Sequence, residues 1–136
     1  MSDRVWLIPV QHNPTQVRIT VGVLDRLHIA HALVNPEAVR DRLNHITPRA
    51  ALVHGGPLSP LLIDVQRWLA EFRVPTMVLV RALTDQVEAT LLDRGAADVL
   101  ALPVSSRKLG SRVEAMVRTA GSRTRPRMPV MVSVEG

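Results

Sequence analysis

Short runs of apolar residues alternate with longer segments of helical periodicity along most of the chain. The apolar runs cover residues 5–8, 29–34, 50–53, 76–80 and 99–102. Because their apolar residues are largely continuous and do not alternate with polar ones, these runs are typical of strands buried on both faces of a parallel sheet. The pattern therefore predicts five buried strands.

One segment has an ambiguous periodicity. In residues 15–27, Val17, Val21 and Leu24 fit one face of a helix, whereas Val17, Ile19 and Val21 alternate as they would in a strand. Strands and helices alternate in order along the rest of the chain, and this order favours a helix here. We therefore predict a helix over residues 15–27.

Capping residues and apolar stripes predict four further helices. Asn35 and Pro36 are typical of a helix start, and Val39, Leu43 and Ile46 then share one helical face. The other three helices are expected to begin at Ser59, Thr84 and Ser105 or Ser106, and the last two to end at Gly95 and Gly121.

Five strands that alternate with amphipathic helices indicate an α/β fold. A parallel sheet needs both faces covered, and right-handed connections then give a doubly wound, three-layer sandwich. Functional side chains of such folds lie at the carboxyl ends of the strands. Here those ends carry Gln11, His12, His54, Arg81 and Leu102.

Length and composition narrow the class of protein. A chain of 136 residues suits one domain, and 46% hydrophobic with 21% charged residues is ordinary for a folded one. The chain has no cysteine, and its five histidines lack the spacing of zinc ligands, so we expect no metal and no cofactor. With no membrane-spanning run and no signal peptide in the sequence, we expect a cytoplasmic protein.

The net charge of +5 comes almost entirely from arginine, and three arginines crowd near the end of the chain. Arg123, Arg125 and Arg127 stand among prolines, which fits either a nucleic-acid contact or a solvated linker. We favour the linker because no aromatic side chain in this segment can stack on bases.

Two stretches in the second half carry a specific resemblance. Residues 74–81 (VPTMVLVR) and 92–109 (LDRGAADVLALPVSSRKL) are similar to the second half of a response-regulator receiver domain. Gly95, Asp98, Pro103 and Leu109 fall where that family repeats its G-A-x-D and P-x-S-x-x-x-L patterns. The resemblance covers residues 4 to about 120, and it implies the flavodoxin-like receiver fold with strand order 2-1-3-4-5.

The resemblance also implies a phosphorylation pocket, and every position of that pocket departs from the family. The Mg²⁺-binding acidic pair falls on Gln11 and His12, and the phosphoryl acceptor falls on His54, or on Val53 if the loop is aligned by Pro57. The hydroxyl position is Val80 and the phosphate-sensing lysine position is Leu102. Without carboxylates for the hard Mg²⁺ ion or an ammonium for the phosphate, phosphoryl transfer would lack charge compensation.

We therefore predict an atypical, aspartate-less receiver domain that is not an enzyme and acts without phosphorylation. His54 as a phosphohistidine or a metal ligand is the sharper alternative, but a histidine that fills the vacant pocket and bonds to nearby backbone is favoured. A second alternative is a pocket that senses a small molecule, lined by Gln11, His12, His54 and Arg81.

We expect the remaining surface of the domain to form a homodimer. In receivers resembling those of OmpR/PhoB winged-helix regulators, the fourth helix, fifth strand and fifth helix form a two-fold interface. Asp98 and Arg112 could then pair across the axis. By position, the interface would contain Glu88, Leu91, Asp93, Asp98, Val99, Lys108, Arg112 and Val113.

Two regions are expected along the chain. Residues 1–120 form the receiver domain, and residues 121–136 form a basic, proline-containing linker with the possible start of a DNA-binding domain. The alternating residues MPVMVSVEG at 128–136 resemble the small sheet that precedes a winged helix. We predict that the full protein is a transcription regulator that contacts DNA through a domain beyond this chain.

Overall fold

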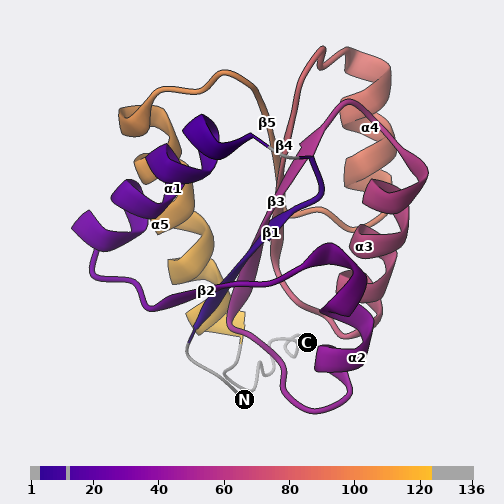
Figure 1. The fold of residues 1–136 in the computed structure, drawn as a ribbon, viewed down its shortest axis with the longest axis horizontal. Helices are drawn as coiled ribbons and strands as arrows, with labels where there is room; N and C mark the ends of the chain where they lie inside the picture. The colour runs from indigo at the N-terminus through magenta and orange to yellow at the C-terminus, as the bar shows by residue number, and fades with distance from the viewer. Residues whose placement is uncertain (1–3, 12, 124–136) are drawn as a thin grey trace, which may run out of the picture.

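The computed structural model describes residues 4–11 and 13–123, and it contains the predicted five-stranded sheet. All neighbouring strands are parallel and follow the order β2-β1-β3-β4-β5, which confirms the predicted receiver-type topology (Figure 1). The strands are β1 (Val5–Pro9), β2 (His31–Leu33), β3 (Ala50–Gly56), β4 (Thr76–Val80) and β5 (Asp98–Ala101).

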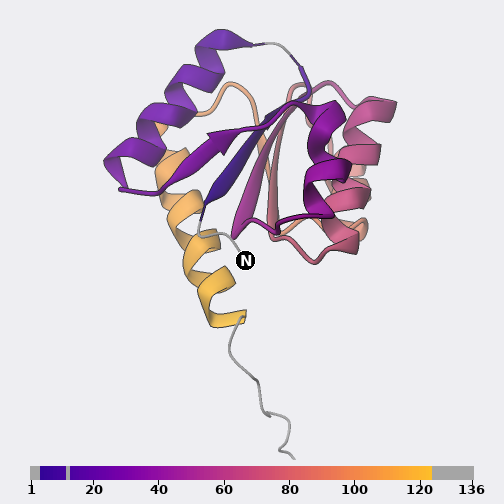
Figure 2. The same ribbon diagram turned by 60° about the horizontal axis from the view of Figure 1, so that its bottom comes forward.

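Helices cover both faces of this sheet, as a doubly wound fold requires. Helices α1 and α5 lie on one face, and α2, α3 and α4 lie on the other (Figures 1 and 2). The helices are α1 (Pro14–Arg26), the 3₁₀ turn η1 (Pro36–Ala38), α2 (Val39–Leu43), α3 (Pro60–Glu71), α4 (Asp85–Asp93) and α5 (Ser106–Arg123). Among the described residues, no helix is long and apolar enough to cross a membrane.

The hydrophobic core is divided by the sheet into two parts. Successive strand residues point to opposite faces, so Leu7 and Leu52 pack under α1 and α5, whereas Ile8 and Val53 pack under α2 to α4. Burial on both faces explains why the strands are continuous apolar runs in the sequence.

The ambiguous segment, residues 15–27, is helical. Helix α1 begins after Asn13, whose side chain accepts a hydrogen bond from the Gln16 backbone N–H at 3.1 Å. Val23 and Leu24 are buried against the sheet, whereas Ile19 is only partly buried. The strand-like alternation is therefore incidental, because the core contacts follow the helical period.

The segment after β2 differs from the prediction. Asn35 caps the 3₁₀ turn η1, α2 follows it directly and ends at Leu43, and β2 is shorter than the predicted run over 29–34. Ile46 lies beyond the helix and is 43% exposed, so its assignment to the buried face is wrong. The chain must become extended before Pro48, and this requirement leaves room for little more than one turn of α-helix.

Two other boundaries also moved. Strand β3 extends through His54 and Gly55 to Gly56, beyond the predicted end at Val53. Gly121 does not end α5, which continues to Arg123, because an isolated glycine weakens a helix without breaking it. Residues 124–136, which hold most of the predicted linker and the predicted start of a DNA-binding domain, lie outside the described residues.

Candidate functional site

The residues that correspond to a phosphorylation pocket meet at the carboxyl edge of the sheet, as predicted. The backbone N–H groups of Val10 and Gln11 both donate to the His54 carbonyl oxygen at 3.0 Å. Arg81 N–H donates to Gly56 at 2.9 Å, and Leu102 N–H donates to Val80 at 2.8 Å. These bonds hold the ends of β1, β3, β4 and β5 together. His12 lies outside the described residues.

Gly55 and Gly56 are required by close packing at this edge. Gly56 has φ +61°, and a Cβ built on it would overlap the side chain of Gln11. A Cβ on Gly55 would lie 2.7 Å from a methyl carbon of Leu62. The glycines are thus the last residues of β3 and not a separate loop. The side-chain amide of Gln11 lies against the backbone of Gly56. The resemblance would place a metal-binding carboxylate at this position.

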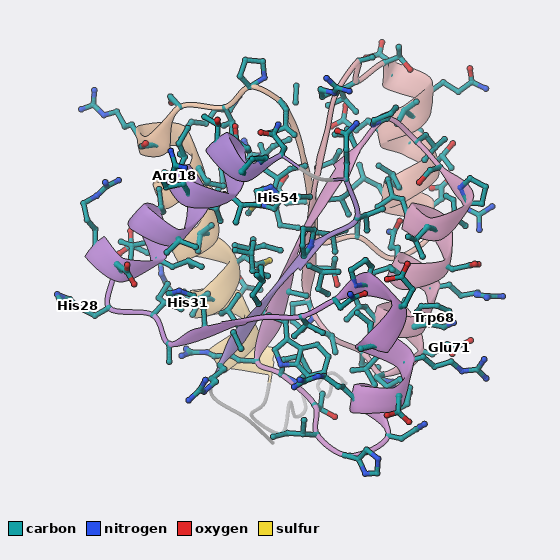
Figure 3. The ribbon with its side chains drawn as sticks, in the orientation of Figure 1. Arg18, His28, His31, His54, Trp68 and Glu71 are labelled. Carbon is teal, nitrogen blue, oxygen red and sulfur yellow. The ribbon has the colours of Figure 1, made fainter. Side chains whose placement is uncertain are left out.

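His54 points into the core on the α1–α5 side of the sheet (Figure 3). Its side chain is 1% exposed, and its Nε2 lies 3.1 Å from Thr20 Oγ1. The Thr20 hydroxyl donates to the Gln16 carbonyl oxygen at 3.0 Å. Because that hydroxyl proton is already used, we assign the ring proton to Nε2, which donates to Thr20 Oγ1.

The other ring nitrogen, Nδ1, is buried and has no hydrogen-bond partner among the described residues. Burial alone lowers the pKa of His54 to about 4, so the imidazole is neutral at pH 7. A neutral, enclosed ring cannot accept a phosphoryl group or hold a ligand from solvent while α1 covers it. This geometry supports the expected buried histidine, but its partner is a threonine side chain and not backbone.

The remaining pocket positions are apolar and closed. Val53 and Val80 are fully buried in the core beneath α2 to α4, and Leu102 packs against the core beneath α1 and α5. At neutral pH none of the five described pocket residues carries a charge: they are Gln11, Val53, His54, Val80 and Leu102.

The small-molecule alternative gains no support from the groove at this edge. That groove lies where β1 and β2 end, and its lining includes Pro9, Val10, Leu33 and Leu61. Gln11, His54 and Arg81, which were expected to line a ligand pocket, do not belong to its lining, and His12 lies outside the described residues.

Three residues expected at the dimer interface lie in the core. Leu91 and Val113 are fully buried and Val99 is 4% exposed, so they cannot contact a second chain directly. Their side chains are the apolar contacts of α4, β5 and α5 with the sheet core. The surface that remains is formed by the charged residues of the same three elements, of which Asp93 and Lys108 are exposed.

Asp98 and Arg112, which were expected to pair across a two-fold axis, pair with each other within the single chain. Arg112 Nε lies 2.7 Å from Asp98 Oδ2, and a terminal guanidinium nitrogen lies 2.6 Å from Oδ1. These hydrogen bonds raise the pKa of Arg112, and the nearby charge of Glu88 raises it further. The ion pair is bidentate and joins the start of β5 to the middle of α5.

The sequence groups Leu92 with Val87 and Leu91 in one apolar stripe of α4, but Leu92 is 43% exposed, so its assignment to that stripe is wrong. Leu92 follows Glu88 by one helical turn, so both residues lie on the same side of α4, and Glu88 is close enough to influence Arg112. The signal was available, because Leu91 and Leu92 cannot both face the core of an amphipathic helix.

Sequence reasoning missed Gln16 and Thr20 as part of the site. They precede Leu24 at intervals of four residues, so all three share the buried stripe of α1. Two polar residues in an apolar stripe indicate a buried polar partner, but the sequence does not identify that partner as His54.

No protein-family model and no curated protein matches this chain by sequence. Solved structures do match it by fold. The signal receiver domain of a protein described as a LuxO repressor from Vibrio parahaemolyticus aligns with TM-score 0.74 and 15% identity, covering 91% of this chain and 96% of that one.

Two further neighbours are receiver domains. That of the Francisella response regulator 1452 aligns with TM-score 0.70 and 16% identity over 90% of this chain and 99% of its own. That of the sensor histidine kinase PA1611 from Pseudomonas aeruginosa, which has a magnesium ion in its active-site cleft, aligns with TM-score 0.66 and 18% identity over 83% and 97%. By topology and by these likenesses, the chain has the receiver-domain fold.

Proposed function

We propose that this chain is an atypical receiver domain that signals without aspartyl phosphorylation, as a dimerisation module of a transcription regulator. The observation that carries the proposal is the lack of charged groups at the positions of the phosphorylation pocket. Its acceptor position is taken by His54, which is buried under α1 and neutral, and the neighbouring positions offer neither carboxylate nor ammonium.

The chemical reason concerns charge. Transfer of a phosphoryl group develops negative charge on its oxygens, and receivers compensate it with Mg²⁺ and a lysine. In this chain Gln11 supplies only a neutral amide, and Val80 and Leu102 supply methyl groups. Neither the metal nor the transferred group would be stabilised at this edge.

Treatment with Mg²⁺ and acetyl phosphate tests the absence of phosphorylation. We expect the intact mass of the chain to remain unchanged, while a receiver domain that carries an acceptor aspartate gains a phosphoryl group in the same reaction. Phosphorylation of any residue at the carboxyl edge of the sheet would overturn the proposal.

The α4–β5–α5 face is the surface we assign to dimerisation. It combines exposed Leu92 with acidic and basic side chains, among them Asp93 and Lys108, so it can be complementary to itself across a two-fold axis. The Asp98–Arg112 pair stiffens this face from within, since it ties β5 to α5.

Sedimentation of two matched variants tests this face. Leu92→Glu introduces a charge on α4 and should convert a dimer to a monomer. Leu33→Glu introduces the same charge at an even more exposed leucine on β2, the opposite edge of the sheet, and should leave the dimer intact. A wild-type chain that stays monomeric at high concentration, or equal effects of both variants, would contradict the assignment.

A role in transcription requires a DNA-binding domain in addition to the receiver domain. We propose that residues 121–136 lead into a winged-helix domain that binds DNA. The reading frame of the gene tests this, because a winged-helix sequence should follow Gly136 directly. A stop codon at that point would remove the DNA-binding part of the proposal and leave the dimerisation part standing.

A further inference from the structure

The polar cluster formed by His54, Thr20 and Gln16 is unusual because it lies inside the apolar core. All three side chains are at most 5% exposed. Two of their polar atoms, His54 Nδ1 and Gln16 Nε2, have no hydrogen-bond partner among the described residues. Buried polar groups are normally satisfied, so this cluster is only marginally compensated.

The single side-chain bond of His54 connects β3 to α1. Its partner Thr20 lies in the middle of α1, and the hydroxyl of Thr20 in turn bonds to the first turn of that helix. Helix α1 is therefore the element that both bonds His54 and separates it from water. Whatever changes the charge of His54 acts first on the contact between α1 and the sheet.

Among the residues that the structure describes, none near His54 carries a charge that could compensate a proton. Strands β1 and β4 carry no ionisable side chain, and α5 turns Leu109 and Val113 inward. The charged residues of α1 and α5 whose side chains the structure describes lie toward solvent, and none of them contributes to the pKa shift of His54; they are Arg18, Asp25, Arg26, Arg107, Lys108, Arg112, Glu114 and Arg118.

One other histidine next to α1 acts in the opposite direction. His31 Nε2 lies 3.9 Å from an Asp25 oxygen, so protonation of His31 strengthens a contact with α1. The Asp25 side chain is exposed and lies at a separation near the limit of an ion pair, so this contact contributes little. It cannot offset the burial of a charged imidazole inside the core.

We propose that His54, Thr20 and Gln16 form an acid-sensitive latch that holds α1 on the sheet, and that protonation of His54 releases α1. A protonated imidazole must reach water, and the shortest way is for α1 to lift. Release would expose the core beneath α1 and α5 and would separate α1 from α5, while α2 to α4 stay packed on the other face.

The pH range follows from the pKa of His54, which is about 4 in the folded chain and 6.5 in water. Because the open form binds the proton more readily, stability is full above pH 6.5 and falls as the pH drops toward 4. Between pH 7.5 and pH 5, linkage predicts that the population with α1 open rises by about 30-fold.

Hydrogen exchange measured at pH 7.5 and pH 5, corrected for the intrinsic rate at each pH, tests the latch. We expect amides of α1, residues 14–26, to lose about 30-fold in protection and to be less protected at pH 5 than amides of α3, residues 60–71, which stay packed when only α1 opens. His54→Leu should abolish the loss, since leucine fills the apolar site and Thr20 keeps its bond to Gln16. His45→Gln, at an exposed histidine, should retain it.

Two results would overturn the latch. One is equal protection of α1 and α3 at pH 5, which would mean that both helices exchange only when the whole chain unfolds. The other is a wild-type His54 imidazole that titrates at pH 6 or above by NMR, a measurement that remains decisive if His54→Leu does not fold. The first result leaves the proposals on phosphorylation and dimerisation standing, whereas the second would also remove the neutral state of His54 from the phosphorylation proposal.

Discussion

At the scale of single residues, the residue types at the expected pocket positions could be read from the sequence, whereas the orientation of their side chains required the structure. Gln11, His54 and Leu102 do meet at one edge of the sheet. That His54 points away from this edge, toward Thr20, depends on which face of β3 it occupies. An extension of β3 by the two glycines decides that face, and no local pattern predicted the extension.

Two glycines with contrasting surroundings give a prediction at this scale. A Cβ at Gly22, inside α1, would meet no atom within 4 Å, so Gly22→Ala should raise the free energy of unfolding by about 1 kcal/mol. Gly56→Ala should lower it by about 1–3 kcal/mol, because φ is +61° and Gln11 occupies the space. Urea denaturation measures both; a neutral Gly56→Ala would contradict the packing of Gln11 on this backbone.

At the scale of elements, the helix ends show how local preferences were partly overridden. Helix α4 is followed by Gly95 with φ +103°, which the sequence predicted. The equivalent positions after α1 and α3 are His28 and Arg73, both with φ +57°. Neither of these two helix ends is marked by a glycine in the sequence. Packing of the preceding helix holds a residue other than glycine in the left-handed region, where it is unfavourable.

Arg73→Gly is therefore expected to stabilise the chain by about 1 kcal/mol, because glycine adopts a positive φ without strain. Arg73→Ala is the matched control: it removes the same exposed side chain but keeps the strain, so its midpoint of thermal unfolding should lie below that of the glycine variant. An alanine variant as stable as the glycine variant would show that the side chain, and not the backbone, is responsible.

At the scale of the whole molecule, the structure separates residues that build the α4–β5–α5 face from residues that form its surface. Leu91, Val99 and Val113 hold the three elements on the sheet, whereas Leu92 and Lys108 lie outside. The resemblance indicated these three elements as a dimer face, but the exposure of each of their side chains required the packed fold. The Asp98–Arg112 ion pair also helps to build this face, because it joins β5 to α5 within one chain.

Val113→Ala should therefore act on stability and not on a surface contact. Removing two methyl groups from a fully buried site should lower the free energy of unfolding by about 2 kcal/mol. Lys108→Ala, on the exposed side of the same helix, should change it by less than about 0.5 kcal/mol. Chemical denaturation of both variants checks this, and similar values would mean that α5 is not packed as described.

The order of elements, the parallel sheet and the lack of carboxylates at the strand ends could be predicted from the sequence alone. They follow from periodicity, capping and residue type, which act over a few neighbouring residues. The enclosure of His54 by Thr20, the pairing of Asp98 with Arg112 and the place of Gln11 on Gly56 required the folded molecule. Each of these joins residues from separate elements, and only the packing of helices on the sheet sets their distance and exposure.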